Sequence, residues 1–319
     1  MSAAGEGRRA PPALLPLCRA LGDLKRIRSA GRAGSIAERL FAGAWAGVAA
    51  GEAMEAVARR TVREALIATR LGDLDAGVLE VAGIPAKEVG RIRGAAFEEA
   101  CAPLDMACCA WLGSGGEAPV AGAPPGFVAR LAAQPRAGAT APGRGRLVLE
   151  PPESHAEHCL LVAVTGALLA PCWEARPETV FLAGLAHHLH NALLPDSGFA
   201  GEVLLGEWLG PAFARATALA LQELSTIPRD RVSAALRVIP DANTPEGRAF
   251  HAADTLDRVL QVEHHLRAAS TRMDYVLREM ELVHAGPVKE FQDAVLARMG
   301  LLPDAAPAWP LEARGGLPA

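Results

Sequence analysis

The sequence predicts an all-α protein, and both composition and periodicity support that class. Ala, Leu, Arg and Glu, which favour helices, dominate the 319 residues, whereas clusters of Val, Ile, Thr and Tyr are scarce. Apolar residues recur at helical spacing, as Val62, Ala65 and Leu66 do. Because 50% of the residues are hydrophobic, the chain can bury a sizeable core, and its length allows about two domains.

The first half reads as a helical domain, residues 14–112, that follows a disordered tail over residues 1–13. Ser35 and Glu38 form a capping box, in which each side chain satisfies a free backbone N–H at the start of a helix. Gly72 interrupts the next helical pattern. These signals predict several helices in this half.

A Gly-, Pro- and Ala-rich stretch, residues 113–149, reads as the connection between two domains. One short helix over residues 127–133 is expected inside it. The second domain spans residues 150–300, and a Pro-rich tail, residues 301–319, follows it.

The second domain carries helix signals of its own. Ser154 and Glu157 form another capping box at the start of an apolar run. We expect one helix over residues 178–194 and another that begins at a Thr-Pro pair and covers residues 244–284. A last short helix is expected over residues 287–299.

Histidines gather in the second domain. Five of the nine fall within residues 153–196. His158 lies in the first turn of one apolar run, the doublet His187-His188 lies near the end of the next, and Asp254 lies in a later helix. One histidine, a doublet and a distant aspartate have the spacing of a metal site built from separate helices.

Three short segments carry a resemblance to a known family. The segments are Ala156-Glu157-His158, Leu185-Ala186-His187-His188 and Ala252-Ala253-Asp254. The second half of the chain resembles the HD-domain metal-dependent phosphohydrolases, most closely their branch of nucleoside 5′-monophosphate phosphatases. The resemblance implies an HD-type helical bundle in which four side chains hold a divalent metal ion, namely His158, His187, His188 and Asp254.

The doublet departs from the family pattern, because the family has His-Asp where this chain has His187-His188. Imidazole nitrogen suits Zn, Fe, Co, Ni or Mn. Replacing a carboxylate by imidazole removes a negative charge and an oxygen donor, which weakens Mg and Mn binding more than Zn or Fe binding. Asp254 lies among apolar residues, and a buried carboxylate needs a cation or hydrogen bonds. An ion pair with Arg258 is the alternative partner for Asp254.

The resemblance also suggests groups around the metal. Asp196 matches an acidic position of the family and could serve as acid or base. Asn191 stands where the family often has a catalytic carboxylate, and an amide cannot accept a proton from water. His190 and His251, together with Asn191, are candidate additional ligands or supporting hydrogen-bond partners.

The resemblance places a phosphate-binding arginine ahead of the His158 helix, and Arg144 and Arg146 are the candidates for that role.

The two halves of the sequence align weakly with each other. Residues 35–40 parallel residues 154–159, and Arg39 falls at the position of His158. Thr69 and Arg70 likewise fall at the positions of the doublet. This predicts two tandem copies, of which the N-terminal one is degenerate and binds no metal. The halves would then pack as the subunits of an HD dimer do, and the chain is expected to be a monomer or a homodimer. Chance similarity between two Ala-rich helical stretches is the alternative.

The function that the resemblance implies is metal-dependent hydrolysis of a small phosphate ester, with a nucleotide as the expected substrate. A first alternative is a catalytically inactive HD scaffold that regulates or senses a ligand, because His188 and Asn191 replace carboxylates. A second alternative is an HD-type di-iron oxygenase, in which His190 and His251 would be the added ligands. Metal content distinguishes the three.

Composition and charge give no indication of binding to nucleic acid or to a membrane. The net charge of −4 gives no electrostatic case for nucleic acid or an acidic membrane. No apolar run reaches the ~18–20 residues that span a bilayer. The six cysteines form no CxxC pair and no disulfide framework, which favours a reducing, cytoplasmic setting.

Overall fold

A computed structural model describes residues 12–113, 122–266 and 272–302. It confirms the all-α class, because it is 68% helical and has no strand in the described ranges, only three isolated bridges. Most of the two predicted tails lies outside the described residues.

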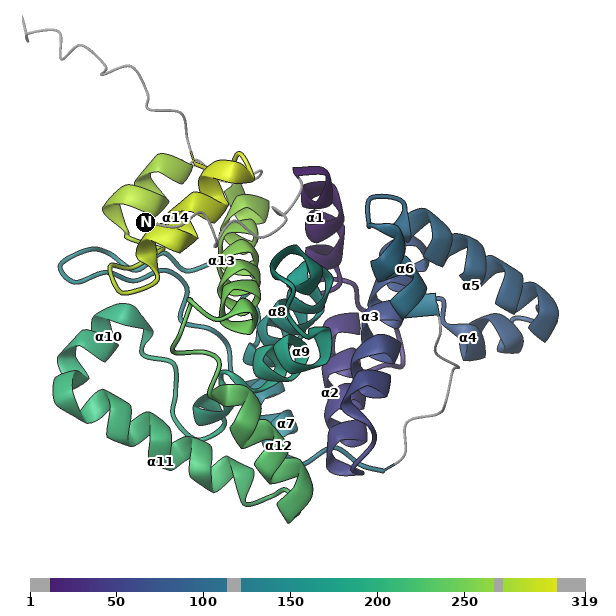
Figure 1. Ribbon diagram of the computed structural model, residues 1–319, viewed down its shortest axis with the longest axis horizontal. Helices are drawn as coiled ribbons and strands as arrows, with labels where there is room; N and C mark the ends of the chain where they lie inside the picture. Colours follow the sequence, from purple (N-terminus) through teal and green to yellow (C-terminus); the bar gives the residue numbers. More distant parts are fainter. Residues whose placement is uncertain (1–11, 114–121, 267–271, 303–319) are drawn as a thin grey trace, which may run out of the picture.

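Two central helices, α8 and α9, organise the molecule (Figure 1). Helices α2 and α3 pack on one side of this pair, and α13 packs on the other. The helices are α1 (Leu15–Asp23), α2 (Ile36–Ala49), α3 (Met54–Leu71), α4 (Ala76–Val81), α5 (Ala86–Cys101), α6 (Met106–Gly113), α7 (Gly126–Ala133), α8 (His155–Leu169), α9 (Pro177–Ala186), α10 (Gly198–Leu205), α11 (Leu209–Leu221), α12 (Thr226–Leu236), α13 (Pro245–Leu266) and α14 (Lys289–Arg298).

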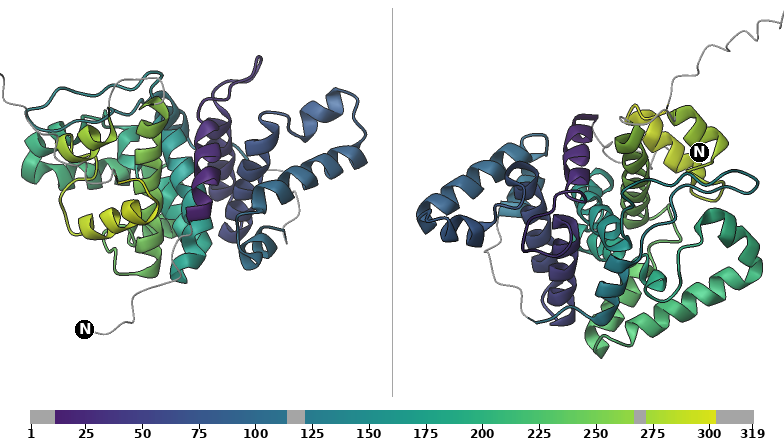
Figure 2. Two further views of the ribbon diagram at one scale, coloured as in Figure 1. Left: turned by 90° about the horizontal axis from the view of Figure 1, so that it is seen from above. Right: turned by 180° about the vertical axis from the view of Figure 1, so that it is seen from behind.

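The peripheral helices are arranged around this centre. Figure 2 shows the α4–α5 pair projecting away from the central helices, while α1 lies against α13. Helices α10, α11 and α12 form a layer on the side of the molecule away from α5 (Figure 1).

Helix α8 is apolar on all sides because it is surrounded by protein. Every residue of α8 is buried, as expected for a core helix. The expectation that no apolar run is long enough to span a bilayer is wrong by length and composition, because residues 155–173 pass that test, but 83% of this segment's apolar window is buried inside the protein. Gly184 lets α9 approach α8 closely, since a Cβ atom there would lie 2.6 Å from the Cα of Ala163.

Both predicted capping boxes are confirmed, and they contact each other. Ser35 caps α2 with Glu38, and Ser154 caps α8 with Glu157. Ser154 Oγ also donates to Glu38 Oε1 at 3.0 Å. The starts of α2 and α8 are therefore joined by a hydrogen bond between the two capping boxes.

The same order of elements precedes each capped helix. A helix, an isolated antiparallel bridge and the capped helix follow one another in both halves. The bridges are Arg28↔Ser35 before α2 and Pro135↔Ser154 before α8. A further bridge, Ala139↔Leu147, lies between α7 and α8 and has no counterpart among the described residues between α1 and α2, so the repeat stays a prediction.

One hydrophobic core runs through both halves. Helix α7, which falls in the predicted connection, contributes to it. Phe127 of α7 packs edge-on against Trp45 of α2, with ring centroids 4.8 Å apart. The stretch 113–149 thus contains a core helix as well as loops.

The predicted helix over residues 178–194 is wrong in its second half. Helix α9 ends at Ala186, and the backbone of His188, at φ −108° and ψ 23°, has left the helix. A short 3₁₀ turn, Leu189–Ala192, follows. Because the doublet terminates the helix, its two rings are freed from the 100° separation that adjacent helical residues have.

The predicted starts of the later helices are confirmed at Pro245 for α13 and near residue 289 for α14. The predicted extension of the first of these to residue 284 is wrong. Helix α13 is described to Leu266, and a separate helical turn, Tyr275–Glu279, follows residues 267–271, which lie outside the described ranges.

Candidate metal centre

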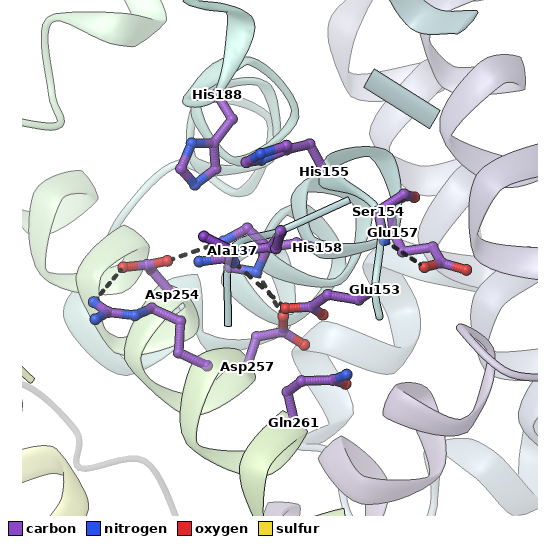
Figure 3. A network of polar contacts seen from close by, with 12 residues as sticks. Ala137, Glu153, Ser154, His155, Glu157, His158, His188, Asp254, Asp257 and Gln261 are labelled. Carbon is purple, nitrogen blue, oxygen red and sulfur yellow. Dashed lines mark hydrogen bonds and ion pairs between the residues drawn. The ribbon is translucent and has the colours of Figure 1, made fainter. Parts of the chain in front are cut away.

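Helix packing brings the four expected ligands together. His158 lies at the start of α8, His187 and His188 directly follow α9, and Asp254 lies on α13. One ring nitrogen of each histidine lies within 4.8 Å of the other two. Figure 3 shows His158 in contact with both Asp254 and Asp257. His158 is buried and the other ligands are half-buried, and the three histidines can hold a metal ion.

Hydrogen-bond partners fix the protonated nitrogen in the two rings of the doublet. His187 Nδ1 lies 2.7 Å from the carbonyl oxygen of Gly184, which can only accept, so Nε2 keeps its lone pair. His188 Nδ1 lies 3.0 Å from Asn191 Oδ1, and the amide nitrogen of Asn191 donates to the Leu194 carbonyl. His188 Nε2 is therefore also available as a ligand.

His158 is oriented in the same way by a carboxylate. Its Nδ1 lies 2.7 Å from Asp257 Oδ2. Burial opposes ionisation of Asp257, but the charge of Lys25 and the contact with His158 outweigh it and lower the pKa of Asp257 to about 2. The carboxylate is thus an acceptor for Nδ1. In the neutral ring the proton then lies on Nδ1, and the Nε2 lone pair faces His187 Nε2 at 3.1 Å and Asp254 Oδ1 at 3.2 Å.

Three electron-pair donors consequently converge on one point. When the rings are neutral, no proton lies between the Nε2 atoms of His158 and His187, so a cation is needed to offset their repulsion. Two nitrogens that bind one zinc ion at about 2.0–2.1 Å are themselves about 3 Å apart. The donor set and its spacing fit a divalent transition metal.

The protonation states suit metal binding. Burial, reinforced by His158, lowers the pKa of His187 to about 3. Burial and the neighbouring His187 hold the pKa of His188 well below its usual value. For Asp254, burial would raise the pKa, but the contact with His158 and the charge of Arg258 outweigh burial and lower it. Neutral imidazoles beside an ionised carboxylate are the forms that bind metals.

A cavity of about 490 Å³ opens beside these ligands. His187, His188 and Asp254 lie in its wall, so the centre is reachable from the cavity. Two arginines, Arg136 and Arg258, line the same cavity. Arg258 Nη1 lies 3.7 Å from Asp254 Oδ2, so the ion pair expected as the alternative partner is present but long.

Asp196 also lines the cavity and is held in place by the backbone. It accepts hydrogen bonds from the N–H groups of Ala137 and Gly198 at 2.9 and 2.8 Å. Its Oδ2 lies 3.5 Å from Nε2 of His155. The His155 ring is fully buried and makes no hydrogen bond within the described residues. Asp196 and His155 therefore form a polar pair beside the ligands.

The candidate additional ligands are engaged elsewhere. His190 stacks on Phe213, with centroids 3.9 Å apart, and does not line the cavity. His251 does line it, but its Nε2 donates to the carbonyl of Ile239 at 2.6 Å. Asn191 supports His188, as described above.

Arg144 and Arg146 lie away from the cavity wall. Arg144 pairs with Glu279 at 3.0 Å, and Arg146 donates to the carbonyls of Ala137 and Ser197. The guanidinium groups at the cavity are those of Arg136 and Arg258 instead.

The sequence analysis did not select three residues that support His158. Asp257, Glu153 and Lys25 form a buried cluster next to it. The position of Asp257 one turn after Asp254 was an available signal, because residues three apart share a helix face. Lys25 comes from the other half of the chain, where no ligand was predicted.

The fold and site together define an all-α protein with a buried histidine and aspartate group able to hold a metal ion. Comparison with family models, with curated proteins and with solved structures finds no match to this chain.

Proposed function

We propose that the protein is a metal-dependent phosphohydrolase that acts on a small phosphate ester, with a nucleotide as the substrate class. The observation that carries the proposal is the convergence of His158 Nε2, His187 Nε2 and Asp254 Oδ1 within 3.1 to 3.9 Å of one another. A zinc, iron, cobalt, nickel or manganese ion is the cofactor that fits this nitrogen-rich set.

A divalent ion bound there supplies Lewis-acid polarisation of a phosphoryl oxygen and acidifies water. The chain's own residues supply the rest. Arg136 and Arg258 face the cavity and can neutralise the phosphate group. Asp196, fixed by two backbone N–H groups, is placed to take a proton from water.

A second carboxyl group could donate the proton that the leaving group needs. Glu202 lines the cavity, and burial together with the nearby charge of Asp196 raises its pKa. A raised pKa favours the protonated acid, which is the form a general acid requires.

The cavity also suits the organic part of the substrate. Its volume of about 490 Å³ falls in the range of small-molecule sites. Three aromatic rings line it and could pack against a base or sugar, namely Phe199, Phe213 and Phe250.

The two alternatives remain as outcomes of the same test. The contacts of His190 with Phe213 and of His251 with Ile239 favour one metal over a di-iron centre. The replacement of a catalytic carboxylate by Asn191 favours the inactive, ligand-sensing alternative.

The test measures metal content and phosphate release on the same purified protein. We expect about one transition metal ion per chain and release of phosphate from nucleoside monophosphates. Asp254→Asn should abolish both, whereas Asp230→Asn, on the exposed part of α12, should change neither. Metal-free protein after expression with each metal would refute the centre. Bound metal without phosphate release would favour the sensing function, and two irons per chain would favour the oxygenase.

A further inference from the structure

A lysine ammonium lies buried between two carboxylates next to His158. Lys25 Nζ lies 2.6 Å from Glu153 Oε2 and 2.8 Å from Asp257 Oδ2. The side chains of these three residues are only 2 to 8% exposed. The charges are therefore shielded from water, and the ammonium neutralises both carboxylates, while Arg136 Nη1 lies 3.6 Å from the other oxygen of Glu153.

The two carboxylates belong to a second group that could hold a metal. Glu153, His158 and Asp257 each place a ligand atom within 4.8 Å of the others. Carboxylate oxygens are the ligands that Mn²⁺ and Mg²⁺ prefer. The ammonium of Lys25 thus stands between the oxygen donors of a potential cation site.

The cluster of Lys25, Glu153 and Asp257 contacts the candidate metal centre through the Oδ2 atom of Asp257. Asp257 Oδ2 accepts from His158 Nδ1 at 2.7 Å as well as from Lys25 Nζ. The same oxygen therefore orients a metal ligand and binds the ammonium. A second cation at this position would lie on the Nδ1 side of the His158 ring, whereas the first would lie on its Nε2 side.

Helix packing holds Lys25 in this position. Lys25 follows α1 directly, and two contacts fasten α1 and the turn after it to α13. Arg19 pairs with Glu263 at 2.5 Å, and Arg26 donates to Gln261 Oε1 at 2.6 Å. A residue of the N-terminal half, Lys25, thereby places its positive charge next to the candidate metal centre of the C-terminal half.

We infer that the Lys25 ammonium takes the place of a second metal ion, so that its removal opens a second cation site on the other side of the His158 ring. This inference rests on the proposed metal centre of His158, His187 and Asp254. Replacement of Lys25 by Ala removes four heavy atoms and leaves two buried carboxylates without their ammonium. A divalent cation with water is the group that fits the space and the charge.

The experiment is a two-step metal titration. Purified protein is first loaded with Zn²⁺, and excess is removed. Mn²⁺ alone is then titrated by calorimetry, and bound Mn is counted by elemental analysis. The wild-type protein should take up essentially no Mn²⁺, whereas Lys25→Ala should take up about one per chain at oxygen ligands.

A matched control tests the role of the carboxylates. Lys25→Ala combined with Glu153→Gln lacks one of the two carboxylates and should lose the Mn²⁺ uptake again. If Lys25→Ala does not fold, Lys25→Asn answers the question, since its shorter amide keeps a hydrogen bond to one carboxylate and still leaves room.

Two results have different meanings. A folded Lys25 variant that holds Zn²⁺ but takes up no Mn²⁺ would overturn the inference and leave the proposed function intact. A wild-type protein that takes up no Zn²⁺ would instead overturn the proposed metal centre. Equal Mn²⁺ uptake by wild type and variant would also contradict the role of Lys25.

Discussion

The Nε2 atoms of His158 and His187 lie 3.1 Å apart, although 29 positions separate the two residues in the chain. In both rings the other nitrogen, Nδ1, contacts the supporting acceptor, which is Asp257 for His158 and the Gly184 carbonyl for His187. The contact depends on how closely the end of α9 approaches the start of α8. The spacing of these two helices therefore controls the spacing of the ligands.

Gly184→Ala should test this dependence. A Cβ atom would lie 2.6 Å from the backbone of Ala163 and must push the helices apart. We expect overpacking to cost about 1–3 kcal/mol in the free energy of unfolding and to weaken Zn²⁺ binding at least tenfold. Urea unfolding and zinc titration measure the two effects.

Gly210→Ala is the matched control for that substitution. Gly210 lies in α11, and an added Cβ atom there meets nothing within 4 Å. The exchange should be neutral or stabilise by about 0.5–1 kcal/mol, because alanine favours helix. Equal zinc affinity of wild type and Gly184→Ala would contradict the close-approach explanation.

His188→Asp should shift metal preference from Zn²⁺ toward Mn²⁺ or Mg²⁺, because a carboxylate replaces a neutral imidazole. Combined with Asn191→Glu, it should raise phosphate release from nucleoside monophosphates. A restored general base contributes about 10²–10⁴-fold. Rates with Mn²⁺, Co²⁺, Zn²⁺ and Mg²⁺ measure the change. A fast wild-type protein and a slower double variant would mean that His188 is an adapted ligand.

Metal-free protein should lose stability as the pH falls below neutrality. Burial lowers the pKa of His190 to about 4 in the folded state, whereas an unfolded histidine titrates near pH 6.5. The unfolded state therefore binds the proton first, and stability declines between about pH 6.5 and 4. For His190 alone the loss could reach about 3 kcal/mol.

Urea unfolding in the presence of a chelator at several pH values measures this decline. His190→Gln should show a shallower dependence over the same range, since glutamine does not titrate. An unchanged slope in that variant would show that other groups, such as His187, dominate.

Ser35→Ala and Ser154→Ala should each cost about 0.5–2 kcal/mol, as the loss of a helix cap does. Because Ser154 also donates to Glu38 of the other capping box, the double variant should deviate from additivity by at least about 0.5 kcal/mol. Denaturant unfolding of the four proteins gives the coupling. Ser225→Ala is the control, since Ser225 precedes α12 without a side-chain cap. Additive changes in the free energy of unfolding would mean that the two helix starts are not energetically coupled.

Local signals predicted much of the fold. The capping boxes at Ser35 and Ser154 and the Thr-Pro start at Pro245 depend on residues a few positions apart, and each was found in place. The end of α9 was not predicted, because no glycine or proline marks Ala186. The helix ends there because the backbone of His188 turns away from the helical conformation.

The site was predictable only in part, for a related reason. His158, His187, His188 and Asp254 were selected from short motifs, and the structure brings them together. Arg136 and Lys25 have no motif, and they reach the site through loops and packing between distant helices. Contacts of that kind depend on the whole fold and leave no local pattern.

The Lys25–Asp257 ion pair joins residues 232 positions apart. During synthesis Lys25 is made long before its partner, and contacts between distant residues pay a large loop-closure entropy before they form. The carboxylates of Glu153 and Asp257 therefore stay hydrated until α1 docks on α13. The buried ion-pair cluster beside His158 is therefore complete only when the two ends of the chain have met.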